Sequence, residues 1–385
     1  MNRILEVDTD SRIAWVEPGV VNLDLTKHLT PLGYHFAPDP SSQQVCTIGG
    51  NVGNNSGGPH CLAYGVTNAH ILAIEVVLAD GEIITLGGLD AEPSGYDLRG
   101  VFIGGEGMLG ITTKVAVRIT PNPPSVRTLL LSFDTPRDAA ATVSAVIAAG
   151  IVPAAMEVMD QGITIAVENY VNVGYPRDAG AVLLAEVDGL PDGVDIDAQR
   201  ISDIGRQHGA TDVRQAASDE ERMLLWKGRK TAFGAVAQIA PNYYLHDTVV
   251  PRSKLADTLE EVYRIADEHD LAVVNVFHAG DGNLHPLLLF NGQEPGIYDR
   301  VHAAGAKIVE ASLAAGGVLS GEHGIGVEKQ PYMHQMFSED DLDHQERLRH
   351  AFDPACRSNP GKVIPVGHSC ADIQSLRNVP EEVWG

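Results

Sequence analysis

Residues 271–290, LAVVNVFHAGDGNLHPLLLF, carry the clearest structural signal in this chain. An apolar run of strand length stands on each side of the Gly280–Asn283 segment. The residues of that segment strongly favour a turn, because glycine and asparagine tolerate positive φ angles. The stretch therefore predicts a β-hairpin that brings His278 and His285 to neighbouring positions.

A second segment, Gly321–Gly326 (GEHGIG), adds a carboxylate and a third imidazole. His278, His285 and Glu322 form a nitrogen and oxygen set that suits a divalent transition metal such as zinc, manganese or iron. His323, next to the carboxylate, is a candidate general base. The alternative interpretation is that all four are ordinary turn residues with histidines at the surface.

The composition describes an ordinary globular protein of 385 residues, with 44% hydrophobic and 20% charged residues, which is long enough for two domains. The net charge of −24 disfavours nucleic acid and anionic membranes as partners. An anionic substrate would therefore need a local cluster of positive charge. No apolar run approaches the ~18 residues of a membrane span. With no export signal and no C-x-x-C spacing, the four cysteines are predicted to be reduced thiols of a cytoplasmic protein.

The order of apolar segments predicts an α+β fold with a domain boundary at Pro121–Pro124. A mostly antiparallel sheet covered by helices is expected in the second domain, and residues 366–385 are expected to be poorly ordered. Strands are predicted over residues 12–18, 71–78, 82–86, 128–133, 154–159 and 181–187, and helices over residues 22–29, 136–149, 253–269 and 298–315. Tyr243 and Tyr244 are expected to pack in the core, with lining of the substrate pocket as the alternative role.

Two glycine-rich segments, Gly49–Gly58 and Gly104–Gly110, do not match G-x-G-x-x-G in a βαβ unit, so a Rossmann nicotinamide site is not supported. Such segments can form an anion-binding nest or approach a flat ring closely, although either alone is more often a long turn. A metalloprotease is disfavoured because H-E-x-x-H is absent.

The chain resembles the FAD-linked oxidase family of the vanillyl-alcohol oxidase/p-cresol methylhydroxylase flavoprotein fold, and in particular its glycolate oxidase and D-lactate dehydrogenase branch. The resemblance rests on Pro38–Ser42, Thr47–Asn51, Ser56–Cys61, Tyr64–Gly65, Tyr96–Arg99, Gly105–Gly107, Leu109–Thr112, Leu225–Trp226, Arg229, His278–His285, Gly321–Gly324 and Asn359–Lys362. It implies an FAD-binding domain over residues 1–122 and a cap domain with the substrate site over residues 123–365. Relatives carry a further segment before the point that matches Met1, with an Arg/Gly-rich loop for the FAD pyrophosphate, and we expect that part to be missing here. Either the true start lies upstream or the chain is a fragment, and a degenerate subunit is the less favoured alternative.

The resemblance also implies roles for individual residues. His278, His285 and Glu322 are expected to hold the metal, His323 to act as the base, and Arg229 to bind the substrate carboxylate. FAD is expected to contact Pro38, Ser41, Ser42, Thr47, Gly49, Gly50, Asn51, Asn55, Gly57, Gly58, Tyr64, Gly65, Gly105, Glu106, Gly110, Ile111 and Asn359.

The expected reaction is oxidation of a small D-2-hydroxy acid, glycolate or D-lactate, to the 2-oxo acid by hydride transfer to FAD. Pro286 and the aliphatic Leu287–Leu289 run favour short acids over D-2-hydroxyglutarate, which is the first alternative substrate. A second alternative is an inactive, FAD-free subunit of a multi-subunit oxidase. The chain has no iron–sulfur cysteine pattern, so companion flavin and iron–sulfur subunits are the expected electron acceptors, and these could place the protein at the inner face of the membrane.

Overall fold

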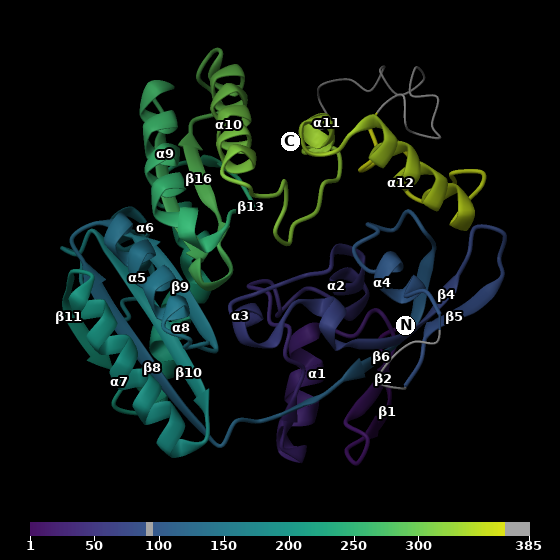
Figure 1. The fold of residues 1–385 in the computed structure, drawn as a ribbon, viewed down its shortest axis with the longest axis horizontal. Coiled ribbons are helices and arrows are strands. Elements are labelled where there is room, and N and C mark those ends of the chain that lie inside the picture. The colour runs from purple at the N-terminus through teal and green to yellow at the C-terminus, as the bar shows by residue number, and fades with distance from the viewer. Residues whose placement is uncertain (90–94, 366–385) are drawn as a thin grey trace.

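The computed structural model describes residues 1–89 and 95–365. Two lobes lie side by side, each built around an antiparallel sheet (Figure 1). The predicted mixed helix and antiparallel-sheet fold is therefore confirmed. The tail predicted over residues 366–385 lies outside the described residues.

The first lobe contains a five-stranded sheet in the order β1-β2-β6-β4-β5. Helices α1 and α2 contribute Leu25, Leu29, Ile48 and Val52 to the core beneath this sheet. The elements of this lobe are β1 (Ile4–Asp8), β2 (Ile13–Val16), α1 (Asn22–Leu29), β3 (Tyr34–His35), α2 (Ile48–Asn54), α3 (Cys61–Tyr64), β4 (Ile71–Val77), β5 (Ile83–Gly87), α4 (Leu98–Phe102), β6 (Ile111–Arg118) and β7 (Thr120–Pro121).

The second lobe contains a nine-stranded sheet whose main path runs β11-β8-β10-β9-β14-β15-β13, with β16 pairing to β14 and β12. Its elements are β8 (Ser125–Phe133), α5 (Pro136–Ala148), β9 (Ala155–Asp160), α6 (Gln161–Tyr170), β10 (Ala181–Gly189), α7 (Pro191–Gln207), β11 (Ala210–Gln215), α8 (Asp219–Val236), β12 (Asn242–Leu245), β13 (Thr248–Val249), α9 (Leu255–Glu268), β14 (Ala272–His278), β15 (Asn283–Leu284), β16 (Pro286–Phe290) and α10 (Ile297–Ala314).

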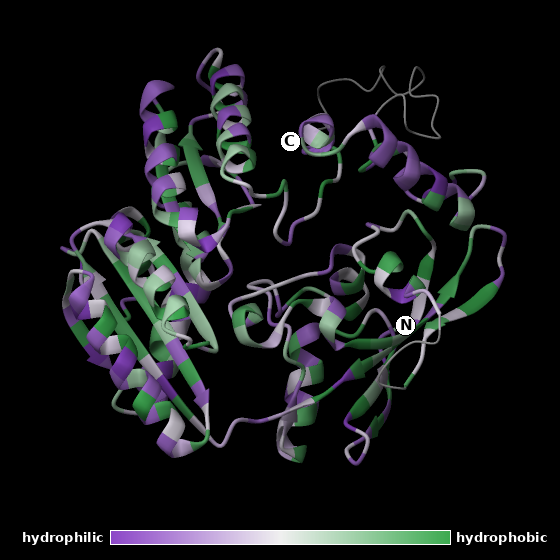
Figure 2. Ribbon diagram, viewed as in Figure 1, coloured by the Kyte–Doolittle hydropathy of each residue, from purple (hydrophilic) through white to green (hydrophobic). Residues whose placement is uncertain are grey.

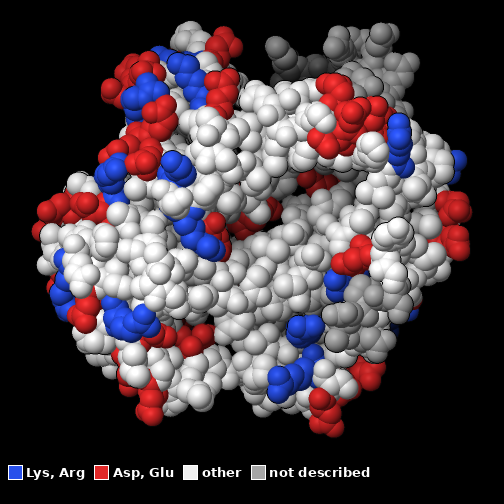
Figure 3. Space-filling model, viewed as in Figure 1, with Lys and Arg blue, Asp and Glu red and all other residues white. Residues whose placement is uncertain are grey.

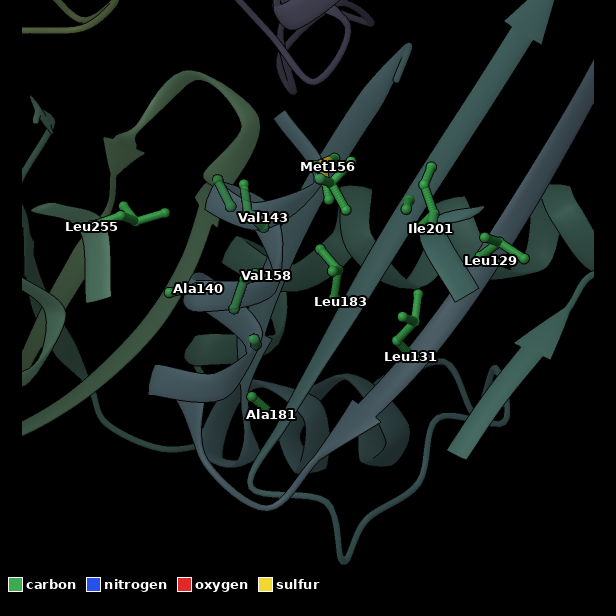
Figure 4. Close-up of a cluster of buried hydrophobic side chains, with 14 of the residues drawn as sticks. Leu129, Leu131, Ala140, Val143, Met156, Val158, Ala181, Leu183, Ile201 and Leu255 are labelled. Carbon is green, nitrogen blue, oxygen red and sulfur yellow. The ribbon is translucent and has the colours of Figure 1, made fainter. Parts of the chain in front are cut away.

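Helices cover both faces of this sheet, which explains why its strands are apolar runs without alternation. Leu129 and Leu131 of β8 point to the cluster that includes α5 and α7, and Figure 4 shows them with Val143 and Ile201. Leu130, between them, points to the opposite cluster, which includes α6 and α8. The hydropathy pattern agrees, since the strands are apolar and the outer faces of the helices are polar (Figure 2).

The chain returns to the first lobe after α10. Helices α11 (Met333–Met336) and α12 (Glu339–Phe352) lie over that lobe (Figure 1). Phe352 packs against the first-lobe core, and Asn359 Nδ2 donates to the Glu106 carbonyl at 2.6 Å. Both ends of the described chain therefore belong to one lobe.

Most predicted elements appear within a few residues of their expected limits, but the predicted strand over residues 284–290 is divided. β15 ends at Leu284 and β16 begins at Pro286, so His285 lies between the two strands. Proline has no N–H to donate to a sheet, which is consistent with an interruption here.

Cys46 and Cys61 are free thiols, but Cys356 is disulfide-bonded, so the prediction of uniformly reduced cysteines is wrong. No helix among the described residues has both the length and the apolarity required to cross a bilayer.

The two lobes meet at His60, whose ring lies between carboxylates from both. His60 Nδ1 is 2.9 Å from Asp39 Oδ2, and Nε2 is 3.3 Å from Glu186 Oε1 on β10. Because both nitrogens face acceptors, the imidazolium form is favoured. Burial lowers the pKa of His60, but Asp39 and Glu186 outweigh burial and raise it to about 10.

We expect His60→Gln to reduce the free energy of unfolding more at pH 6 than near pH 10. The raised pKa means that the imidazolium contributes fully below the ordinary value of 6.5 and that this contribution is lost as the pH approaches about 10. The loss at low pH should be about 1.5–3 kcal/mol, typical of hydrogen bonds to charged groups. Denaturant unfolding of both proteins at the two pH values measures it, and an equal loss at both would contradict the ionic role.

Candidate functional site

His278, His285 and Glu322 converge, each with one ligand atom, so that the three atoms lie within 4.8 Å of one another. Glu322 Oε1 is 3.3 Å from His278 Nε2 and 3.7 Å from His285 Nε2. The two imidazoles are buried, while the carboxylate is 12% exposed. The hairpin and the GEHGIG segment therefore meet as the sequence predicts.

Strand register orients His278. His278 is the last residue of β14 and pairs directly with Glu157 of β9. Its Nδ1 lies 2.8 Å from Glu157 Oε1, which leaves Nε2 directed at Glu322. A carboxylate behind a metal-binding histidine fixes the ring and its tautomer in this way. Burial lowers the pKa of His278, but Glu157 and Glu322 raise it to about 10, so metal and proton would compete for Nε2.

The second imidazole, His285, is held differently. Its Nε2 lies 3.4 Å from Asp247 Oδ1, yet neither ring nitrogen makes a hydrogen bond of acceptable geometry. Burial lowers the pKa of His285 although Asp247 opposes this shift, and the ring is therefore favoured in the neutral form that ligates metals. A buried imidazole without a hydrogen-bond partner fits a metal ligand.

Asp247 organises the loop that carries Glu322 and His323. Its carboxylate accepts hydrogen bonds from the backbone N–H groups of residues 321–323 and from Ser320 Oγ at 2.6 Å. Lys329 Nζ lies 3.2 Å from Asp247 Oδ2 and is itself buried. One buried ion pair therefore fixes the loop against the back of the cluster of His278, His285 and Glu322.

Arg229, predicted to clamp the substrate carboxylate, is fully buried beneath the cluster. Its Nε and Nη2 lie 2.7 and 2.6 Å from Glu157 Oε2. The guanidinium thus supports the carboxylate that orients His278, and only Nη1 lacks a partner. The cation that does line the neighbouring cavity is Lys230.

A cavity of about 520 Å³ lies between the lobes, and we name it the His323 cavity. Its lining residues are Pro40, Ser41, Ser42, Asn54, Ser56, Lys230, Phe233, Tyr243, Leu245, Glu322 and His323. His323 presents its ring to this space, with 43% of the side chain exposed, and stacks on His285 at 5.1 Å between ring centroids. Tyr243 also lines it, which matches the alternative role for this tyrosine and not the preferred one, whereas Tyr244 packs in the core as expected.

The residues predicted to contact FAD are spread over several places in the first lobe. Ser41 and Ser42 line the His323 cavity. Thr47, Gly49, Gly105, Gly110 and Ile111 line a separate cavity of about 470 Å³, and Asn55 and Glu106 line one of about 350 Å³ that also reaches Glu322.

The remaining predicted FAD contacts do not line these three cavities, and the buried side-chain amide of Asn51 has no hydrogen-bond partner among the described residues. The Pro38 carbonyl accepts from Asn22, and Gly58, Gly65 and Asn359 have positive φ. Tyr64 hydrogen-bonds Asp188 across the lobe interface. Gly50 and Asn51 lie in α2, and a Cβ on Gly57 would come within 2.9 Å of Glu322 Oε2.

The glycine-rich backbone and these cavities, two of which reach Glu322, suit an elongated cofactor with a flat ring. Gly53 lines the 470 Å³ cavity, and a Cβ added to this residue would have no heavy atom within 4 Å. The backbone at Gly53 therefore borders open space. The donor set of two imidazoles and one carboxylate likewise fits a divalent transition metal.

The hairpin turn tolerates no side chain at Gly282. This residue has φ +74°, and a Cβ there would lie 2.2 Å from the Val250 carbonyl oxygen. We expect Gly282→Ala to cost about 1–3 kcal/mol of stability and to weaken metal binding by displacing His285. Gly81→Ala is the control, because it also has positive φ but nothing within 4 Å. Equal effects of the two changes on metal content would contradict the prediction.

Two family profiles match this chain, one over each of its two parts. Residues 1–87 match the family profile described as FAD binding domain, and residues 122–363 match FAD linked oxidases, C-terminal domain. The glycolate oxidase subunit GlcD of Escherichia coli (strain K12) is 47% identical over 373 residues, covering 97% of this chain and 75% of its own length. D-lactate dehydrogenase of Anaerostipes hadrus is 32% identical, covering 94% of this chain and 78% of its own.

A solved structure of p-cresol methylhydroxylase with substrate bound superposes with a TM-score of 0.79 at 16% identity, covering 95% of this chain and 79% of that one. This similarity shows a shared fold. Together with the profile matches and the identity to GlcD, it shows that the chain belongs to the FAD-linked oxidase family, within the vanillyl-alcohol oxidase fold.

Proposed function

We propose that this protein oxidises a small D-2-hydroxy acid, such as glycolate or D-lactate, to the 2-oxo acid. The observation that carries the proposal is the meeting of His278, His285 and Glu322 at the edge of a cavity that His323 also lines. The 47% identity to a glycolate oxidase subunit and the 32% identity to a D-lactate dehydrogenase support the same chemistry.

When bound, FAD accepts the two electrons of the oxidised C–H bond, and a divalent metal makes the substrate hydroxyl more acidic. His278, His285 and Glu322 would hold that metal. His323 Nε2, 3.8 Å from Glu322 Oε1, takes the hydroxyl proton. Lys230 supplies the positive charge that a carboxylate substrate requires in an acidic protein. Phe233 and Leu245 give the cavity an apolar wall that excludes water.

Glu157 and Arg229 act behind the cluster. The carboxylate holds the Nδ1 proton of His278, and the guanidinium compensates the charge of the carboxylate. We therefore assign Arg229 a positioning role in place of direct substrate binding. The free Nη1 is the one group of this side chain still able to donate.

The argument for short substrates from Leu287–Leu289 does not hold. These residues belong to β16 and are buried in the apolar cores on both sides of the sheet, so they do not line the His323 cavity. Tyr243 and Lys230 do line it, and they are the side chains to vary when glycolate, D-lactate and D-2-hydroxyglutarate are compared.

The GlcD proteins are named as subunits of glycolate oxidase. We propose by analogy that companion subunits take the electrons from this chain.

The test is the visible absorption spectrum of the purified chain before and after anaerobic addition of glycolate or D-lactate. We expect a flavin band that bleaches with one of them. A colourless chain, or a flavin band that no 2-hydroxy acid bleaches, would contradict the proposal.

Removal of the metal should abolish bleaching while the flavin band remains, because the metal ligands are not among the predicted FAD contacts. We expect turnover to fall by at least about 100-fold after chelation and to return with zinc, manganese or iron. Glu322→Gln should show the same loss without chelator. Full activity of a metal-free protein would contradict this part of the assignment.

A further inference from the structure

A second cavity, of about 650 Å³, opens beside the His323 cavity, and we name it the α8 cavity. It is lined by residues 41–45 and by one side of helix α8. Ser41, Ser42 and Lys230 belong to both cavities, so the two spaces are neighbours. Figure 3 shows Lys and Arg side chains at the margin of the opening between the lobes and acidic side chains deeper within it.

Helix α8 presents three cations to this cavity: Arg222, Lys227 and Lys230. Lys227 forms no ion pair with a carboxylate of the described residues. Lys230 Nζ lies 3.9 Å from Asp39 Oδ2, at the limit of an ion pair. Arg222 Nε pairs with Asp219, whose side chain is 82% exposed and therefore well solvated. Its Nη1 also lies 3.8 Å from Glu186 Oε2. The charges of Lys227 and Lys230 are thus only weakly compensated.

The single acidic residue in the lining, Glu186, is occupied by other partners. It accepts hydrogen bonds from Thr128 Oγ1 and from Trp226 Nε1, each at 2.5 Å. It also faces His60, which is protonated near neutral pH because of its raised pKa. Glu186 therefore offsets part of the charge of Arg222 and His60 and is in ion-pair contact with neither lysine, so the lining keeps an excess of positive charge.

This excess is unusual in a chain of net charge −24. A long-range field of that sign repels small anions, and a local positive cavity reverses the effect where a ligand must enter. The remaining lining includes the apolar Val45, Met223 and Trp226. Trp226 is buried, while Val45 and Met223 are exposed. Cations beside apolar side chains suit a small organic carboxylate better than a fully hydrated inorganic ion.

We propose that the α8 cavity is an anion-binding antechamber that collects small carboxylates and delivers them to the His323 cavity. Lys227 and Arg222 attract the anion, and Lys230, which is shared by both cavities, transfers it. The identity of the carboxylate as a 2-hydroxy acid rests on the proposed function, but the binding of a carboxylate does not.

The kinetic test compares Lys227→Gln with the wild type, using the FAD-loaded full chain and glycolate or D-lactate. At low ionic strength we expect kcat/KM to fall about three- to tenfold with kcat unchanged, because steering acts on the encounter. At about 0.5 M salt, where the Debye length is only a few ångströms, the two proteins should converge. Lys227→Arg should behave as the wild type.

Lys307→Gln is the matched control, since it removes the same charge from α10, where Lys307 pairs with Glu268. It should leave kcat/KM and its salt dependence unchanged. Equal kcat/KM values for the wild type and Lys227→Gln at low salt would overturn the antechamber, as would an equal loss in Lys307→Gln.

A second measurement does not need turnover. Calorimetric titration of the chain with acetate should give binding that weakens at least about threefold in Lys227→Gln. If no 2-hydroxy acid bleaches the flavin, the proposed function fails while this titration still tests the antechamber. Absence of acetate binding in the wild type would overturn the proposal. So would loss of the Lys227 dependence on loading with FAD, because the cavity would then be a cofactor site.

Discussion

His323→Ala should reduce the rate of substrate oxidation by at least about 100-fold while FAD and metal remain bound. The loss is expected because a positioned general base contributes about 10²–10⁴-fold. The ring reaches the cavity from a loop that Asp247 fixes, and it stacks on His285 without being one of the three converging ligands. Its removal should therefore take away the proposed proton acceptor and leave the candidate metal ligands His278, His285 and Glu322 in place.

The measurement is the rate of flavin bleaching after rapid anaerobic mixing with substrate. This reports the chemical step without any contribution from the electron acceptor. His344→Ala is the control, because His344 lies on α12 and its Nδ1 hydrogen-bonds the Asp340 carbonyl of its own helix. Near wild-type bleaching in His323→Ala would remove His323 from the mechanism.

The sequence was most informative where structure is local. The 271–290 hairpin could be predicted because turn residues and two apolar runs are adjacent in the chain, and α1 has the limits that were predicted for it. The predicted proximity of Glu322 to the hairpin came from residue chemistry. His278 and Glu322 are 44 residues apart in the sequence. No local sequence pattern predicts that the fold brings them together.

The supporting acids were missed for the same reason. Glu157 interrupts the apolar run Ala155–Asp160, and Glu186 interrupts Ala181–Gly189. A charged residue between apolar residues of a buried strand indicates that its side chain has a buried partner. That signal could have marked both positions, but it could not have named the partner, because the pairing of β9 with β14 is a tertiary property.

Arg229 and Lys230 show how one position on a helix changes the role of a cation. Successive residues of an α-helix are turned by about 100°, so that Arg229 faces the buried Glu157 while Lys230 faces both cavities. The sequence alone does not show which of these two adjacent cationic side chains is buried. The direction of α8 relative to β9 decides it.

Asp247→Asn should be the most destabilising of the conservative substitutions considered, with a loss of about 3–5 kcal/mol in the free energy of unfolding. The amide keeps the shape of the carboxylate but leaves the Lys329 ammonium buried without a counter-charge. It also weakens the acceptor for the N–H groups of residues 321–323. Metal affinity should fall by about 10–100-fold, as for other groups that orient ligands.

A double-mutant cycle with Lys329→Met separates charge from shape. The Asp247→Asn/Lys329→Met protein should recover part of the lost stability, because the unpaired buried charge is gone. Asp195→Asn is the surface control: Asp195 is 59% exposed in its pair with Arg127, and its loss should cost less than about 1 kcal/mol. If Asp247→Asn costs no more than this control, the loop does not depend on a buried charge. If the double variant regains stability but not metal affinity, the ion pair stabilises the fold and the carboxylate separately positions Glu322 and His323.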